Sequence, residues 1–266
     1  WMSESGENSN QWFADAIHLF ESNNIGWSWW PVKKSRTNNI FKVTTPESYY
    51  QLLQAWESEE SLSADQSYLA VMEYSKAHRH ENTTVAPDVI YALLNNEDPT
   101  ATKAYRFHRV NEWIPFVDYD LGRDGYAYED RLSQNIHNEQ GQWKVWNEGR
   151  KYRNDGVDIG GSAGGYFVSW TEPGEWLQYT IQVPQAGEFK LELETKGAAS
   201  RLRMEINDEI KNDEIAIKTG SENSPGEWAT TTVNGIELST GELKIRFHIQ
   251  EGAPDLRAFR LVSGLE

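Results

Sequence analysis

The chain has 266 residues, of which 41 are acidic and 25 basic, so its formal net charge is -16 at pH 7. A surplus of this sign repels phosphate and argues against nucleic acid as a partner. Cysteine is absent, so neither disulfides nor thiol chemistry are expected. No run of 18 apolar residues occurs, and we expect no membrane partner. Twelve tryptophans and twelve tyrosines offer flat rings that suit sugars, although most such rings pack in protein cores.

The first hundred residues read as short strands alternating with helices. An apolar run ending at Glu4 predicts a strand, and apolar residues at helical spacing predict a helix over 11–24, capped by a serine or asparagine of the run Asn8-Ser9-Asn10. The indole-rich run 27–30, closed by Pro31, predicts a second strand. Further helices are predicted from Thr45 through Trp56, over 64–80 and over 87–94.

The pattern changes after Pro99 from helical spacing to the alternation of half-buried strands. The clearest predicted strands are 176–183, 189–195, 202–206, 228–233 and 243–249. So many short strands between glycine, asparagine and proline turns indicate an independent β-sandwich. We therefore predict three segments, with an α/β part over 1–99, a linker over 100–112 and an all-β sandwich over 113–266.

The run Ser3-Glu4-Ser5-Gly6, followed by the helix and the indole strand, resembles the strand-seven nucleophile motif of glycoside hydrolase family 5. These are cellulase-type retaining hydrolases. The resemblance implies the C-terminal portion of a (β/α)8 TIM barrel, with Glu4 as nucleophile. It implies that Trp30, Trp29 and Lys33 bind substrate. The alternatives are that Glu4 is a solvated loop residue, and that Glu7 serves the first turn of the helix or orients a neighbour.

The second half resembles a family 6 carbohydrate-binding module, a jelly-roll sandwich. The matching motifs are 118–120, 125–128, 152–159, 174–179 and 226–228. In that family two aromatic rings clamp a sugar and a polar residue binds its hydroxyls, which implies Tyr152, Trp228 and Asp255 here. The alternative is that Tyr152 and Trp228 belong to the core. Trp170, Trp176 and Tyr179 lie in or beside alternating strands and are predicted to be core.

Cofactors are not expected. Many family 6 modules hold a structural calcium on acidic residues of the first strand, but the matching stretch 114–117 is apolar, and Asp118 and Asp120 come only afterwards. The Asn154-Asp155-Gly156 run is read as a turn. No Asn-Glu-Pro tripeptide, which carries the family 5 general acid, occurs in the chain.

Together these patterns predict a retaining, endoglucanase-like hydrolase that acts on β-1,4-glucan or a related plant or algal β-glycan, with an appended sugar-binding module. The alternative is a non-catalytic glycan-binding or surface-adhesion protein. Expected partners are a polysaccharide or oligosaccharide and the remaining, N-terminal part of the barrel. We expect a secreted or cell-surface protein of bacterial origin.

Overall fold

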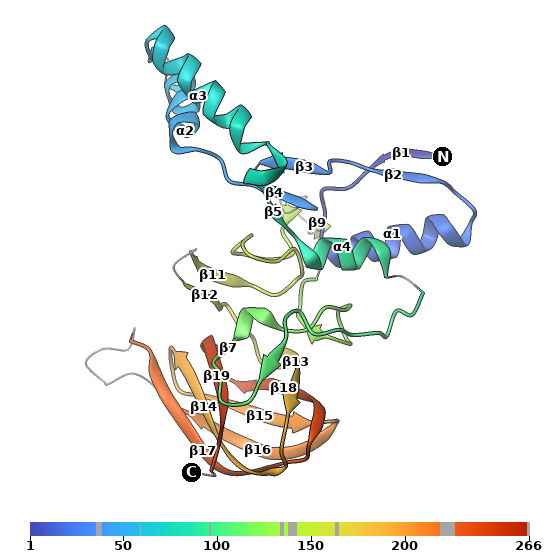
Figure 1. Ribbon diagram of the computed structural model, residues 1–266, viewed down its shortest axis with the longest axis vertical. Coiled ribbons are helices and arrows are strands. Elements are labelled where there is room, and N and C mark those ends of the chain that lie inside the picture. Colours follow the sequence, from blue (N-terminus) through green and yellow to red (C-terminus); the bar gives the residue numbers. More distant parts are fainter. Residues whose placement is uncertain are drawn as a thin grey trace.

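The computed structural model describes residues 1–35, 39–58, 60–95, 97–133, 136–137, 143–162, 165–218 and 227–264. Its helices lie in the N-terminal part, and a β-sandwich forms the other end of the molecule (Figure 1). The helices are α1 (Asn10–Ser22), α2 (Glu47–Glu57), α3 (Ala64–Ala77) and α4 (Pro87–Leu94), with 3-10 turns η1 (His80–Asn82) and η2 (Phe116–Asp118).

The strands are short in the N-terminal part and long in the sandwich. The former are β1 (Met2–Ser5), β2 (Trp27–Trp29), β3 (Lys33–Ser35), β4 (Phe41–Val43) and β5 (Thr84–Val85). The remainder are β6 (His108–Arg109), β7 (Ile114–Pro115), β8 (Tyr128–Glu129), β9 (Ile136–His137), β10 (Trp143–Lys144), β11 (Ile159–Ser162), β12 (Gly165–Val168), β13 (Trp176–Val183), β14 (Gly187–Lys196), β15 (Ser200–Ile206), β16 (Glu209–Ile217), β17 (Ala229–Leu238), β18 (Gly241–Glu251) and β19 (Asp255–Ser263).

Strands β1 and β2 pair in parallel and α1 connects them, which is the strand, helix, strand unit that the sequence predicts. The Ser9 side chain caps α1 by accepting the Trp12 N–H, and Phe13 and Ile17 bury the inner face of the helix. The described N-terminal strands form one two-stranded and one three-stranded sheet. The barrel of which this unit would be a portion therefore remains a prediction.

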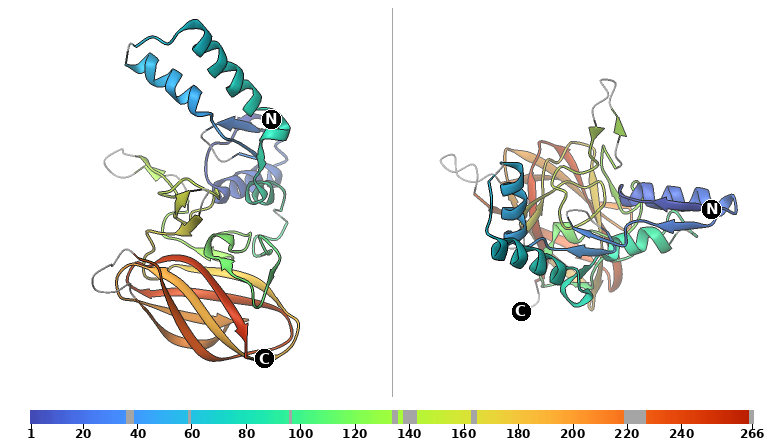
Figure 2. Two further views of the ribbon diagram at one scale, coloured as in Figure 1. Left: turned by 60° about the vertical axis from the view of Figure 1, so that its left-hand side comes forward. Right: turned by 90° about the horizontal axis from the view of Figure 1, so that it is seen from above.

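Helices α2 and α3 project from the N-terminal part as a pair (Figure 2). The rings of Tyr49 and Tyr74 stack between them with centroids 3.9 Å apart. No helix in the described part of the chain is long and apolar enough to cross a membrane.

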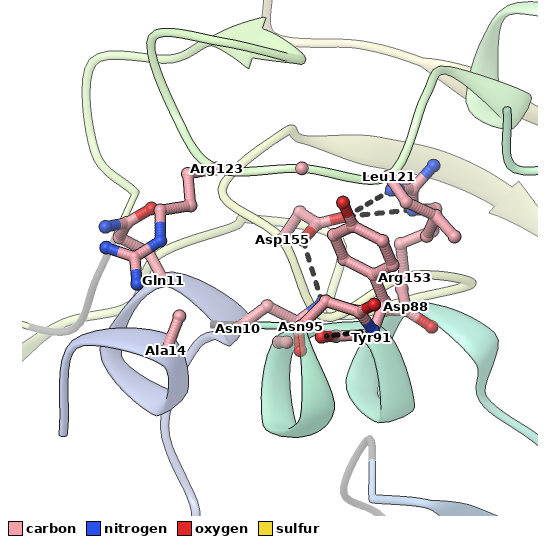
Figure 3. A pocket seen from close by; sticks show the side chains of 12 residues that line it. Asn10, Gln11, Ala14, Asp88, Tyr91, Asn95, Leu121, Arg123, Arg153 and Asp155 are labelled. Carbon is pink, nitrogen blue, oxygen red and sulfur yellow. Dashed lines mark hydrogen bonds and ion pairs between the residues drawn. The ribbon is translucent and has the colours of Figure 1, made fainter. Parts of the chain in front are cut away.

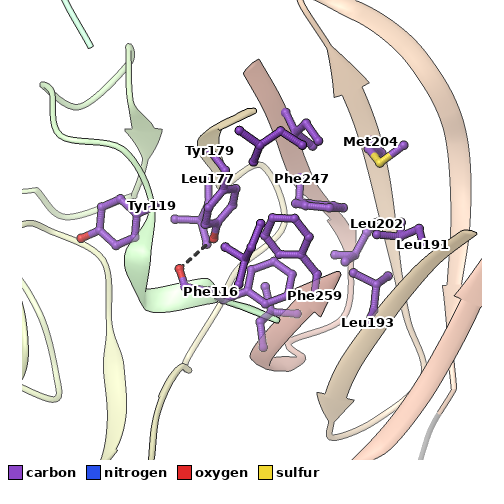
Figure 4. Close-up of a cluster of buried hydrophobic side chains, with 14 of the residues drawn as sticks. Phe116, Tyr119, Leu177, Tyr179, Leu191, Leu193, Leu202, Met204, Phe247 and Phe259 are labelled. Carbon is purple, nitrogen blue, oxygen red and sulfur yellow. Dashed lines mark hydrogen bonds between the residues drawn. The ribbon is translucent and has the colours of Figure 1, made fainter. Parts of the chain in front are cut away.

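The C-terminal part is the predicted sandwich, built from two six-stranded sheets (Figures 1 and 2). One sheet has the order β11-β12-β19-β14-β17, with β7 on β19, and the other has the order β16-β15-β18-β13-β6, with β8 on β13. Alternating apolar residues of both sheets meet in one core. Its centre is aromatic, where Phe116, Tyr179, Phe247 and Phe259 pack edge to face (Figure 4).

The segment predicted as a linker, residues 100–112, lies in the sandwich. Lys103 and Leu121 exchange two backbone hydrogen bonds, β6 pairs with β13, and the Asn111 N–H donates to the Leu261 carbonyl. The sandwich therefore begins before residue 113. The sequence did not reveal this because β6 is only two residues long and its pairing partner lies about 70 positions later in the chain.

Candidate functional site

An aromatic pair lies on the outer face of the sheet that contains β12, β19, β14 and β17. Phe167 of β12 and Trp228, just before β17, meet edge to face with ring centroids 5.2 Å apart. Phe167 lies over β11, where Gly160 leaves room for it: a Cβ there would approach Phe167 Cε2 to 2.8 Å. Glycine thus allows the ring to approach the neighbouring strand closely, and the two rings, inclined at 75° to each other, form an apolar surface on the sheet that we call the platform.

Two cationic side chains lie over the rings of this pair, and each cation has an acidic partner. Lys196 Nζ lies 4.9 Å from the Phe167 centroid, 5.1 Å from the Trp228 centroid and 2.9 Å from Asp255 Oδ2. Arg257 Cζ lies 4.8 Å from the Trp228 ring, and its Nη2 lies 2.8 Å from Glu194 Oε1. Register places these groups together, because Lys196 and Asp255 face each other across β14 and β19. Donors and acceptors beside apolar rings are what a sugar with hydroxyl groups requires.

Trp170 follows β12, and the residue before it, Ser169, is hydrogen-bonded to Asp255. The Trp170 side chain is 54% exposed and its backbone has φ of 51°, which is uncommon for a bulky residue. Hydrogen bonds hold it on both sides, because Ser169 Oγ donates to Asp255 Oδ1 at 2.5 Å and Thr171 Oγ1 donates to the Pro254 carbonyl at 2.8 Å. Strained residues fixed in this way concentrate at binding sites. Trp170 was predicted to be core, and that prediction is wrong.

We call this surface the Trp228 patch. It consists of Phe167, Ser169, Glu194, Lys196, Trp228, Asp255 and Arg257, and Trp170 adjoins it in the chain through Ser169. Two of the predicted site residues, Trp228 and Asp255, lie in it. The sequence analysis missed the others, although the outward alternation of Phe167 along its strand was a signal that could have found it.

The third predicted residue, Tyr152, lies on the other side of β12. Its ring packs against Tyr105 and Tyr166 at 5.9 and 5.0 Å between centroids, and its hydroxyl donates to Asp118 Oδ1. Because Tyr166 and Phe167 are neighbours in one strand, their side chains point to opposite faces. Tyr152 is half-buried and packs against the core, and the aromatic partner that the structure gives Trp228 is Phe167, not Tyr152.

A second feature lies in the N-terminal part, where Glu4 and Trp30 line one open hollow of about 530 Å³. Both side chains are exposed, Trp30 by 44%. Gly6 is required beside them, because a Cβ there would lie 1.9 Å from the Trp30 carbonyl oxygen. Glu7 lines the same hollow and forms an ion pair with Lys34 at 2.5 Å.

The other two residues predicted to bind substrate in this part lie elsewhere. Trp29 packs edge to face on Phe13 at 4.6 Å and contacts Trp27, so its ring belongs to the small core beneath α1. Lys33 donates from Nζ to the His78 carbonyl at 2.7 Å. It is Lys34 whose ammonium lies over the Trp30 ring, 4.8 Å from its centroid.

Beneath the Trp170 loop, carboxyl groups line a cavity of about 10 Å³ together with Ser169 and Thr171. Burial and neighbouring carboxylates raise the pKa of Asp130 to about 9 and that of Glu175 to about 7. Burial likewise raises the pKa of Asp158 to about 6. Within the described residues, no group of three or more histidine, cysteine, aspartate or glutamate side chains is placed to hold a metal ion.

No curated protein matches the chain. Among solved structures it is similar to the C-terminal family 6 module of a marine laminarinase from Zobellia galactanivorans, with 18% identity, 40% of this chain and 88% of that chain covered, and a TM-score of 0.36. A family 6 module from Clostridium stercorarium in complex with cellobiose gives 12% identity, 60% and 98% coverage and a TM-score of 0.39.

A family 35 carbohydrate-binding module from Clostridium thermocellum gives 18% identity, 41% and 88% coverage and a TM-score of 0.34. All three TM-scores lie below 0.5. The family model described as "Carbohydrate binding module (family 35)" matches residues 153–261, which is less than half of the chain. The match does not reach the N-terminal part and lends no support to the resemblance to family 5 hydrolases. Residues 153–261, which lie in the C-terminal sandwich, are thus similar in sequence to carbohydrate-binding modules.

Proposed function

We propose that this protein binds a neutral polysaccharide or oligosaccharide at the Trp228 patch. The observation that carries the proposal is the Phe167 and Trp228 platform, ringed by side chains that can donate and accept hydrogen bonds. Because Lys196 and Arg257 are each paired with a carboxylate, the patch presents little net charge. An acidic glycan would have to displace those carboxylates and approach a protein of net charge -16, which favours neutral sugars.

The platform supports weak, reversible binding. Covering about 100 Å² of apolar sugar and ring surface at about 25 cal/mol per Å² contributes on the order of 2 to 3 kcal/mol per ring. After the cost of association, one or two such contacts give dissociation constants in the micromolar to millimolar range, as an order-of-magnitude estimate.

Isothermal titration of the full chain with cello-, xylo- and laminari-oligosaccharides tests the proposal. Trp228→Ala and Trp170→Ala should each weaken binding about tenfold or more, the loss expected when a contact of more than about 1.4 kcal/mol is removed. The matched control is Trp56→Ala, since Trp56 is a 65% exposed indole on α2, remote from the sandwich. Unchanged affinity in both Trp228→Ala and Trp170→Ala, with wild-type binding intact, would refute the assignment.

A second candidate is hydrolysis, and one observation favours it: the exposed Glu4 and Trp30 share an open hollow at the end of a parallel strand pair. We propose Glu4 as the nucleophile of a retaining β-glycan hydrolase with Trp30 beneath the sugar. Such a reaction also needs a protonated carboxyl about 5 Å from the nucleophile. Segments beyond this chain, such as further parallel strands, would supply it.

The test is covalent trapping. The protein used is a form of this chain, with any further segments that the reaction needs, that hydrolyses a β-glycan. A fluorinated glycosyl donor should label it on the peptide that contains Glu4. The substitution Glu4→Gln should abolish turnover while preserving substrate binding. Glu7→Gln is the matched control, because Glu7 lines the same hollow and pairs with Lys34. Labelling at Glu7, or full activity of Glu4→Gln, would contradict the assignment.

A further inference from the structure

A buried polar cluster joins the N-terminal part to the sandwich (Figure 3). Asn10, the first residue of α1, donates from Nδ2 to Asp88 Oδ2 at 3.0 Å and to Asp155 Oδ1 at 2.8 Å. Asp88 Oδ2 also accepts the backbone N–H of Asn154 at 2.7 Å. All four residues are at most 4% exposed. Two helices of one part and one loop of the other thus share one network.

The loop of residues 152–155 takes its backbone partners from the N-terminal part. The Asn154 carbonyl accepts the Asn10 N–H at 3.0 Å, and Asn154 Nδ2 donates to the Asn8 carbonyl at 2.8 Å. Lys42 Nζ of β4 donates to the Tyr152 carbonyl. Buried backbone groups need partners, so the N-terminal part stabilises this conformation of the loop.

Three residues further along the chain, the same loop contacts the Trp228 patch. The Asp158 carbonyl accepts the Ser169 N–H at 3.0 Å, and Asp158 Oδ1 accepts the Glu148 N–H at 2.6 Å. Ser169 is the residue whose hydroxyl binds Asp255 and whose neighbour is Trp170. A continuous path therefore runs from Asp88 on α4 to Asn154, along the chain to Asp158, and by a hydrogen bond to Ser169. Ser169 in turn binds Asp255 and precedes Trp170.

We propose that Asp88 is a positioning residue for the glycan site, acting through the 152–158 loop on Ser169 and Trp170. This rests on the proposed function. Asp88 Oδ1 is buried without a hydrogen-bond partner among the described residues. A buried acceptor without a partner lowers the stability of the fold, so packing alone does not explain a carboxylate at this position. Its other oxygen accepts the Asn154 N–H and fixes the start of the loop.

The experiment compares two substitutions in the full chain. Asp88→Asn keeps an oxygen that can accept the Asn154 N–H, whereas Asp88→Leu removes it. Amide hydrogen exchange of the peptide that contains Ser169 and Trp170 should accelerate by about fivefold or more in Asp88→Leu and much less in Asp88→Asn. Affinity for an oligosaccharide that the wild type binds should fall by about 2- to 30-fold in Asp88→Leu, the range of indirect coupling effects. Asp213→Leu, at an exposed carboxylate of β16, is the control.

The two readouts separate the two proposals. If the wild type binds no glycan, the proposed function fails, while hydrogen exchange still decides whether Asp88 positions Trp170. If Asp88→Leu does not fold, Asp88→Ala takes its place, since it also removes the acceptor of the Asn154 N–H. Unchanged exchange at Ser169 and Trp170 in the variant that folds, or an equal effect of Asp213→Leu, would overturn the positioning role.

Discussion

Arg153 provides the sharpest test of how the sandwich is stabilised. Its side chain is 1% exposed, and Nη2 lies 2.6 Å and Nε 2.8 Å from Asp155 Oδ2. The guanidinium also lies 3.8 Å from the Tyr119 ring centroid and donates to the carbonyls of Tyr119 and Asp120. It therefore compensates a buried carboxylate and two buried backbone carbonyls at once.

Substitution Arg153→Met keeps much of the volume and removes the charge. Breaking a buried ion pair by deleting one partner costs about 3 to 5 kcal/mol, because the other charge stays buried without compensation. At about 2 to 4 °C per kcal/mol for a chain of this size, the melting temperature should fall by about 6 to 20 °C.

Differential scanning calorimetry of the wild type, Arg153→Met and the double variant Arg153→Met/Asp155→Asn measures this loss; the amide removes the charge and keeps an oxygen for Asn10 and Tyr119. The double variant should recover part of it, since no charge is then left buried in the pair. A loss below about 2 °C in Arg153→Met, or a double variant less stable than the single one, would refute the reasoning.

Three further outcomes are expected. Burial raises the pKa values of Asp158, Glu175 and Asp130 to about 6, about 7 and about 9, so the folded state holds their protons more tightly than the unfolded state. The free energy of unfolding in urea should therefore be lower at pH 8 than at pH 5, by about 2 kcal/mol or more after allowing for partial exposure, and an increase would contradict this. A fragment of residues 101–266 should melt at a higher temperature than one of residues 113–266, which lacks β6; equal circular-dichroism melting curves would count against the packing of that segment. Tyr179→Phe removes a buried hydrogen bond of 2.7 Å to the Phe116 carbonyl and should cost about 1 to 2 kcal/mol, whereas Tyr68→Phe, at a 65% exposed ring, should cost nothing measurable by urea unfolding.

The elements with strong local signals could be predicted from the sequence. Helix α4 has the predicted bounds because Pro87 suits the first helical position, and β13 has them because its residues alternate strictly. Strands β16 and β19 were not predicted, although β19 lies inside its sheet between β12 and β14. Their many charged residues hide them, since those side chains point outward and pair across strands.

The site was harder to predict than the fold because its geometry depends on distant residues. Alternation along β12 would send Trp170 inward with Tyr166 and Val168, but positive φ ends the alternation and exposes the indole. The Tyr152 to Asp155 motif resembled a sugar-binding stretch, yet its polar groups pair with Asn10 and Asp88, more than 60 positions away. No local pattern carries that information.

The packing of residues 100–112 into the sandwich changes how the module can search for its ligand. Thirteen residues of flexible chain would let a module sample positions with a root-mean-square reach of about 20 Å. Here Lys103, His108 and Asn111 are hydrogen-bonded or paired within the sandwich, so that reach is lost. If a polysaccharide binds at the Trp228 patch as proposed, it would be held at one fixed angle to the hollow of Glu4 and Trp30. A rigid arrangement of this kind would favour a glycan whose chains all run in the direction set by that angle, and it would suit randomly oriented chains poorly.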